Sequence, residues 1–251
     1  DNEWDILLNN LINYKSFSFY NFNGELIPSA YMPPLYPFFL YLINILTSFE
    51  ESNLLYSIFF IQILFSTYSV YLFYEINKNF FSNNLSLISS TIFSFVPLNI
   101  YACGQISSIN LQIFFSLLFL KFLFLIIKKE NNKNIIIFAI VSGLLFLTRG
   151  EFILIFFLIF VFSIWKKKIR LINLTKIVIV VLLIISPYVA RNYIHFNQLF
   201  IVKSLGFNLW KGNNQTSYVG GTYFHVPSTL EELYLWENLK EPEFKDMKGQ
   251  L

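Results

Sequence analysis

Residues 107–133 read SSINLQIFFSLLFLKFLFLIIKKENNK, a long apolar run followed by a basic loop. A transmembrane helix needs roughly 20 predominantly apolar residues, and Lys and Arg gather in loops on the cytoplasmic side of a membrane. The run at 107–127 meets that length, and Lys128, Lys129 and Lys133 follow it directly. This stretch therefore predicts a membrane span that ends in the cytoplasm.

The composition of the whole chain agrees with a membrane protein. Of the 251 residues 55% are hydrophobic and 13% are charged, with a mean hydropathy of +0.56. A soluble domain carries about 25% charged residues, so the composition excludes a water-soluble enzyme and a disordered chain. The net charge of +3 is small and its basic residues are dispersed between apolar runs, which argues against a nucleic-acid partner. The single cysteine, Cys103, excludes an internal disulfide.

The fold class predicted from these runs is an all-α integral membrane protein, a multi-span helical bundle. We expect residues 1–53 to form a first outer loop, 54–190 a six-span bundle and 191–251 a truncated outer segment. The chain begins at Asp1 without Met, so we expect a fragment of a longer protein. The six predicted spans are 54–76, 85–103, 107–127, 134–149, 151–165 and 174–190.

The basic loops also predict which side each segment faces. A second basic cluster, at 166–176, follows the first by two spans and so lies on the same side. Counting back places residues before Leu54 outside, so the apolar segment 35–49 is expected to be interfacial or re-entrant, with an ordinary span as the alternative. Most carboxylates then lie outside, so any chemistry is predicted there.

The start of the chain has the pattern of an amphipathic helix. Trp4, Leu7, Leu8 and Leu11 share one helical face, and Asp1, Asp5 and Asn9 share another. This acidic face is either simply solvated or supplies a general base that takes the proton of an attacking hydroxyl. The prolines at 33, 34 and 37 then hold the chain extended as an elbow before the apolar segment.

Several motifs, in order along the chain, resemble one family. The acid-rich start with Asn10-Leu11 and the elbow Ser29-Ala30-Tyr31-Met32-Pro33-Pro34-Leu35-Tyr36-Pro37 are followed by Val96-Pro97-Leu98 through Tyr101, Gly104 and Gln105, by Leu147-Thr148-Arg149-Gly150-Glu151, by Arg191-Asn192-Tyr193, and by Gly206-Phe207-Asn208-Leu209-Trp210 with Gly212-Asn213-Asn214. This series is similar to the GT-C membrane glycosyltransferases of the protein-mannosyltransferase and lipid A aminoarabinose-transferase type.

The resemblance implies inverting transfer of a sugar from a polyprenyl-phosphate donor. The acceptor would be a lipid, glycan or protein hydroxyl at the periplasmic face of a bacterial inner membrane. An aspartate of the first outer loop is the implied catalytic base; Asp1 falls at or near that position, with Glu3 and Asp5 in reserve.

Two arginines are the predicted contacts of the donor phosphate. Arg149 and Arg191 both fall at the predicted outer surface, and a guanidinium binds phosphate oxygens bidentately. The alternatives are an interfacial anchor for either residue and an ion pair between Arg149 and Glu151. Three further residues of the matched motifs are predicted to bind substrate: Tyr36, Gln105 and Glu151.

The chain departs from the family after Gly104-Gln105. Many members carry an acid there, whereas this chain has Ile106, Ser107, Ser108, Ile109 and Asn110. The second acidic partner is left to Glu50, Glu51 or Glu151. No cofactor is firmly predicted; a divalent cation stays open, although His195 and His225 are 30 residues apart and no paired-acid spacing is present. The rival functions are a transporter or lipid flippase and a non-catalytic membrane subunit.

Overall fold

The computed structural model describes residues 3–22, 25–47, 51–166 and 168–204. The chain divides into two compact units, which are described separately. The helical unit comprises residues 34–187, and the hairpin unit comprises the described residues before 34 and from 188 onward. The division places the segment after the proline elbow with the bundle instead of with the residues before it.

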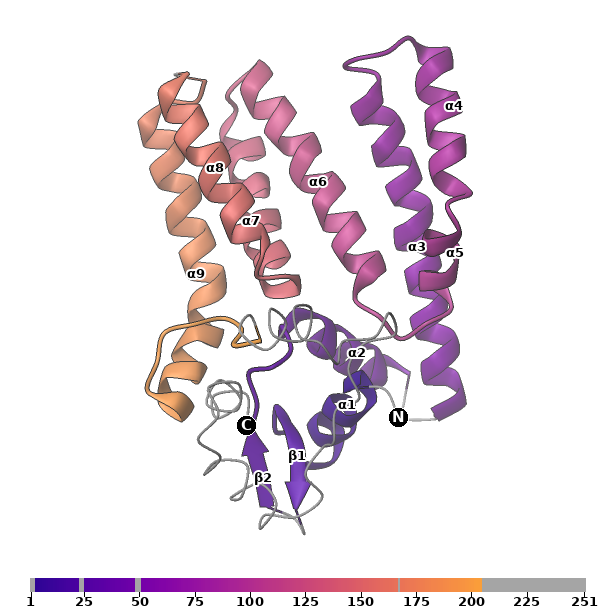
Figure 1. The fold of residues 1–251 in the computed structure, drawn as a ribbon, viewed down its shortest axis with the longest axis vertical. Coiled ribbons are helices and arrows are strands. Elements are labelled where there is room, and N and C mark those ends of the chain that lie inside the picture. Colours follow the sequence, from indigo (N-terminus) through magenta and orange to yellow (C-terminus); the bar gives the residue numbers. More distant parts are fainter. Residues whose placement is uncertain (1–2, 23–24, 48–50, 167, 205–251) are drawn as a thin grey trace, which may run out of the picture. The chain divides into compact units, whose positions relative to one another are not determined.

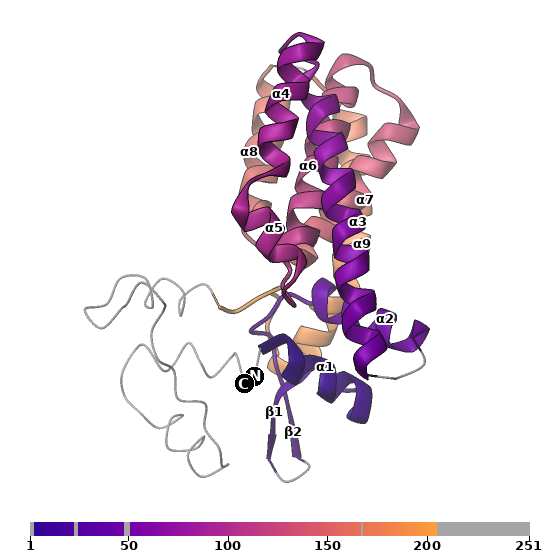
Figure 2. The same cartoon turned by 90° about the vertical axis from the view of Figure 1, so that its right-hand side faces the viewer.

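The helical unit consists of helices connected by short turns, as Figure 1 shows. Its elements are α2 (Leu35–Leu46), α3 (Glu51–Asn77), α4 (Asn83–Ser94), α5 (Pro97–Cys103), α6 (Ile109–Lys128), α7 (Asn132–Thr148), α8 (Phe152–Trp165) and the part of α9 (Leu171–Phe196) up to Pro187. The α3–α4, α6–α7 and α8–α9 connections lie at one end of this unit, at the top in Figure 1 and in the rotated view of Figure 2, which we call the basic end. The α5–α6 turn (residues 104–108) and the α7–α8 turn (149–151) lie at the other, which we call the turn end.

Each of the six predicted spans is helical, and the all-α prediction is confirmed, but the helices differ in length. Within the described chain, α3, α6 and α9 are long and apolar enough to cross a membrane, and α4 with α5 counts as a fourth if the pair, bent by 55°, is one span. The bend precedes Pro97, which disfavours helical geometry at Val96. At 14 residues α8 is about 21 Å long, less than the roughly 30 Å hydrocarbon core. By length and composition alone, three or four of the six expected spans are thus long enough to cross a membrane, and α7 and α8 are shorter, as the short apolar runs at 134–149 and 151–165 indicate.

Helix α2 belongs to the helical unit but is shorter than the long helices α3, α6 and α9. It has 12 residues, too few to cross a bilayer, and packs on α3 and α7. It begins after Pro34 and ends at Thr47, whose hydroxyl donates to the carbonyl of Ile43 at 3.0 Å. A row of aromatic contacts runs from α2 into the bundle, from Tyr36 to Phe39, from Phe39 to Phe65 on α3, and from there to Phe114 on α6.

The bundle is held by apolar packing between α3, α4 and α6. Leu72, Ile76 and Leu117 are buried there, and Phe73 stacks on Phe93 with ring centroids 4.5 Å apart. Helices α7 and α9 approach closely at Gly143, where a Cβ would lie 2.8 Å from a methyl carbon of Ile184. Many large apolar side chains on the outer faces remain exposed, Phe60, Ile92, Leu154 and Leu183 among them, which suits helices that face lipid.

The hairpin unit combines α1 (Glu3–Tyr14), the antiparallel strands β1 (Ser18–Phe22) and β2 (Glu25–Pro28), and the end of α9. Leu7, Leu8 and Leu11 are buried and Asn9 is exposed, so the predicted amphipathic helix is confirmed. The hairpin itself was not predicted. Its sequence signal is Asn23-Gly24 between two runs of strand-forming residues, which favours a two-residue hairpin loop.

Candidate functional site

A buried glutamine connects three segments at the turn end of the helical unit. The hydroxyl of Tyr36 on α2 donates to Oε1 of Gln62 on α3 at 3.0 Å. The amide nitrogen of Gln62 donates to the carbonyl oxygens of Cys103 at 3.2 Å and of Gln105 at 2.9 Å. Gln62 and Tyr36 are each 1% exposed. The Gln62 amide thus fixes α2 and the α5–α6 turn to α3.

This network contains two of the predicted substrate-binding residues in roles that the sequence did not indicate. The hydroxyl of Tyr36 is used inside the protein, and Gln105 takes part through its backbone carbonyl while the residue stays exposed. Gln62 was not among the functional residues predicted from the sequence. The available signal was an amide in the middle of an apolar run, where polar side chains are costly and are retained for a partner.

The turn that lacks the family's acid contains buried neutral polar residues instead. Ser108 and Asn110 are each 2% exposed. Asn110 Oδ1 accepts a weak hydrogen bond from the Cys103 thiol at 3.8 Å, and its Nδ2 is buried without a hydrogen-bond partner among the described residues. The turn therefore supplies amide and hydroxyl groups, and no carboxylate, at this position.

Arg149 lies in the tight turn predicted between the fourth and fifth apolar runs. Helix α7 ends at Thr148 and α8 begins at Phe152, whose N–H donates to the Arg149 carbonyl at 3.3 Å. The Nε–H of Arg149 is buried and has no hydrogen-bond partner in the described chain. The ion pairs found among the described residues join Lys78 to Glu75 and Arg170 to Glu130, so Arg149 does not pair with the exposed Glu151. Buried N–H groups in folded proteins usually have a hydrogen-bond partner, so this unpartnered N–H makes Arg149 a candidate for a ligand contact, and a phosphate contact stays a prediction.

Arg191 is held by the backbone of the hairpin unit. Its Nη1 donates to the Ser29 carbonyl at 2.7 Å and to Asn192 Oδ1 at 2.8 Å, and its Nη2 donates to the Phe17 carbonyl at 2.7 Å. Phe17 and Ser29 flank the two strands, so the guanidinium closes the base of the hairpin. The Nε–H and one Nη2–H make no further hydrogen bond within the described residues. A phosphate contact from these two groups stays a prediction.

The neighbouring Asn192 also donates hydrogen bonds to backbone carbonyls. Its Nδ2 donates to the carbonyls of Phe200 at 3.0 Å and Ile201 at 3.2 Å, and the residue is fully buried. The Arg191-Asn192 pair of the sequence motif therefore ties the end of α9 to the hairpin base and to the segment that follows α9.

The predicted acids remain untested as catalytic groups. Asp1 and Glu50 lie outside the described residues, as do the 206–214 motif and the helix expected from Ser228. Glu3 begins α1 and Glu51 begins α3. Asp5 lies on the partly exposed face of α1 and has an interaction partner. Among the described residues, no group of three or more His, Cys, Asp or Glu side chains is placed to hold a metal ion.

Replacing Gln62 by Leu tests the polar network. The variant leaves the carbonyls of Cys103 and Gln105 and the hydroxyl of Tyr36 without their partner, at a cost of about 1–3 kcal/mol per unsatisfied buried group. We expect a clear fall in the thermal unfolding temperature in detergent. Gln112→Leu is the matched control, because the Gln112 side chain makes no hydrogen bond in the described chain. Equal unfolding temperatures for the two variants would show that the network contributes nothing.

One family model matches the proline elbow and the helical unit described above. The family model described as dolichyl-phosphate-mannose-protein mannosyltransferase matches residues 32–191, well over half of the chain. The match runs from the proline elbow through the helical unit to Arg191. No curated protein and no solved structure matches the chain. The chain therefore belongs to the dolichyl-phosphate-mannose-protein mannosyltransferase family, membrane glycosyltransferases of the GT-C kind that use a lipid-linked sugar donor.

Proposed function

We propose that the chain is an inverting glycosyltransferase that moves a sugar from a polyprenyl-phosphate-linked donor to a hydroxyl of a lipid, glycan or protein. Transfer takes place on the periplasmic face of a bacterial cell membrane. The family match supports glycosyl transfer in a membrane. The observation that carries the finer proposal is the buried, unpartnered Nε–H of Arg149 at the turn end.

The charges of the helical unit support the proposed side. The basic end carries eight described Lys and Arg residues: Lys78, Lys128, Lys129, Lys133, Lys166, Lys168, Arg170 and Lys176. The positive-inside rule assigns that end to the cytoplasm. The turn end, with Arg149 and the α5–α6 turn, then faces the periplasm, the side at which a flipped lipid-linked sugar would be met.

The reaction needs two groups that the chain offers as candidates. The acceptor oxygen attacks the anomeric carbon from the face opposite the phosphate, so the bond from that carbon to the phosphate oxygen breaks with inversion. The proton of the acceptor hydroxyl passes to a carboxylate, for which Asp1, Glu3 and Asp5 are the candidates. The charge that develops on the departing phosphate needs a cation to stabilise it, and half-buried Arg149, whose Nε–H is buried and unpartnered among the described residues, is our candidate.

Of the two predicted arginines, Arg149 is the better phosphate ligand. Its Nε–H has no protein partner, whereas three N–H groups of Arg191 already bind carbonyl and amide oxygens. Arg191 then acts mainly by holding the hairpin unit together.

The three candidate bases can be separated by substitution. Asp1→Asn, Glu3→Gln and Asp5→Asn are each made in the full-length protein, and sugar transfer from a polyprenyl-phosphate sugar is measured in membranes. We expect one of the three to lose about 10² to 10⁴-fold in rate, because a positioned general base contributes that much. Glu75→Gln, at the basic end, is the control and should keep wild-type transfer. Activity within a few-fold of wild type in all three variants would remove the α1 acids from the mechanism.

The two arginines should respond differently to substitution. For Arg149→Gln we expect kcat/KM for the donor to fall about 10² to 10³-fold with little change in unfolding temperature, since a transition-state contact is lost. For Arg191→Lys we expect mainly a lower unfolding temperature, because an ammonium cannot reproduce the guanidinium's three hydrogen bonds. Normal donor kinetics in Arg149→Gln would contradict the phosphate role.

A further inference from the structure

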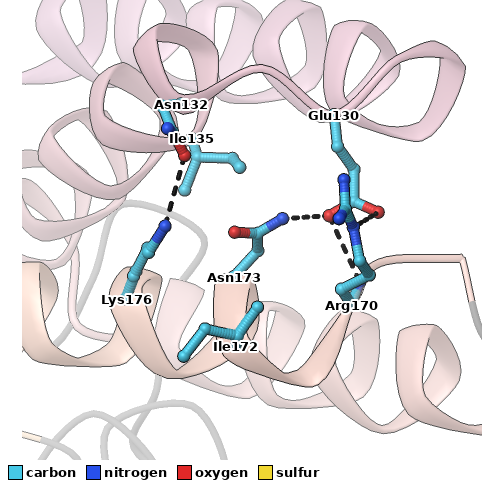
Figure 3. Close-up of a pocket in the computed structure, with 7 residues that line it drawn as sticks. All are labelled: Glu130, Asn132, Ile135, Arg170, Ile172, Asn173 and Lys176. Carbon is cyan, nitrogen blue, oxygen red and sulfur yellow. Dashed lines mark hydrogen bonds and ion pairs between the residues drawn. The ribbon is translucent and has the colours of Figure 1, made fainter.

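The basic end of the helical unit contains a polar cavity, far along the bundle from the turn end. Its volume is about 290 Å³, and Figure 3 shows the side chains that line it. Glu130, Asn132 and Ile135 come from the α6–α7 loop and the start of α7, and Arg170, Ile172, Asn173 and Lys176 come from the start of α9. The cavity thus lies between two loops that meet at the predicted membrane surface.

Glu130, the acid among the described residues of the cavity wall, accepts three hydrogen bonds from protein donors. Glu130 Oε1 accepts from Arg170 Nε at 3.2 Å, and Oε2 accepts from the Arg170 backbone N–H at 3.3 Å and from Asn173 Nδ2. Burial on its own raises the pKa of Glu130, but the hydrogen bonds from Asn173 and Arg170 outweigh it and lower that pKa. The carboxylate is therefore ionised near neutral pH and already neutralised by its neighbours.

The cations of the wall keep donors to spare. Arg170 uses only Nε toward Glu130, so both of its terminal NH₂ groups are without a hydrogen bond among the described residues, and its side chain is 73% exposed. Lys176 Nζ donates to Asn132 Oδ1 at 3.2 Å, which leaves two N–H groups. Arg170, Lys176 and Glu130 together give the cavity wall a net charge of +1. The two cations also keep N–H groups that donate to no acceptor among the described residues.

The surroundings select an anion that belongs to a membrane. Lys128, Lys129, Lys133, Lys166 and Lys168 are exposed around the same end. Glu75, the other described acid near this end, is paired with Lys78 at 2.6 Å. Ile172 on the cavity wall is 62% exposed, next to the apolar surface of α9. A phosphate between Arg170 and Lys176 would have acyl chains beside it on the helix surface.

We propose that this cavity binds the phosphodiester of an anionic phospholipid in the leaflet that meets the basic end. The terminal NH₂ groups of Arg170 offer the planar fork that fits two phosphate oxygens, and Lys176, six residues further along the chain, offers a second cation on the cavity wall. Glu130 orients Arg170 and holds it at the mouth of the cavity. Bound lipid would link the α6–α7 loop to the start of α9.

The test uses the purified full-length protein in neutral detergent, titrated with phosphatidylglycerol or phosphatidylcholine, with lipid binding followed by native mass spectrometry. For the wild type we expect phosphatidylglycerol to bind at least about tenfold more tightly than phosphatidylcholine, the effect of one or two charge-assisted hydrogen bonds. The double variant Arg170→Gln with Lys176→Gln should lose this preference. The control Lys133→Gln with Lys168→Gln removes the same charge from the same end but not from the cavity wall, and should keep the preference.

Three results would overturn the proposal. One is equal binding of both lipids by the wild type, and another is an equal loss in both double variants, which would show diffuse surface electrostatics. The third is displacement of phosphatidylglycerol by millimolar inorganic phosphate, which would make the cavity a site for free phosphate. If the cavity double variant does not fold, the single variant Lys176→Gln takes its place. It removes an ammonium that donates to the Asn132 side chain, and we expect it to weaken the preference for phosphatidylglycerol by about threefold. An unchanged preference in this variant would also overturn the proposal.

Discussion

The hydrogen bonds of the Gln62 side chain are the contact on which the turn end of the helical unit depends. A bilayer offers no partners to the polar groups of α3, so an amide placed there must be satisfied by protein. Gln62 meets this need by accepting from Tyr36 of α2 and donating to the carbonyls of Cys103 and Gln105. One side chain thereby fixes the helix that follows the proline elbow and the turn before α6. Both segments carry motifs of the family to which the chain belongs.

The same physical constraint separates the two ends of the bundle. Charged side chains lie mostly at the ends of the bundle. At the basic end the two described acids, Glu75 and Glu130, form ion pairs with Lys78 and Arg170. The turn end has few charges, and Arg149 retains a buried N–H without a partner among the described residues. An end rich in exposed cations is suited to lipid headgroups, and at the other end we propose that Arg149 contacts the anionic group of the substrate. The family assignment gives that substrate its class, a lipid-linked sugar.

The fold could be predicted from the sequence where hydrophobicity and length alone decide it. All six apolar runs are helices, and the buried face of α1 follows the spacing of Leu7, Leu8 and Leu11. The expected span at 85–103 is broken by a local backbone effect at Pro97, whereas the short run at 151–165 forms a helix, α8, of nearly the same bounds. The hairpin was not predicted because its strands are only five and four residues long, although the Asn23-Gly24 pair favours a hairpin loop.

The candidate site was less predictable because its contacts join residues far apart in the chain. Motif matching selected Tyr36, Gln105 and Arg191 as substrate ligands, and the structure gives Tyr36 and Arg191 internal hydrogen-bond partners. No periodicity indicates that Gln62 connects residues 26 and 43 positions away. The hydrogen bonds from Arg170 and Asn173 to Glu130 could not be predicted either, because these partners lie 40 or more positions further along the chain.

The proposed function requires that the turn end faces the periplasm and the basic end the cytoplasm. Single cysteines at Gly150, where an added Cβ meets no atom within 4 Å, and at Lys133 test it most directly, in a background with Cys103→Ser. Intact cells are treated with a membrane-impermeant maleimide, and labelling is compared with that of permeabilised cells. If the turn end faces the periplasm, Gly150→Cys is labelled in intact cells and Lys133→Cys is labelled only after permeabilisation. The reverse pattern, or labelling of both in intact cells, would contradict it.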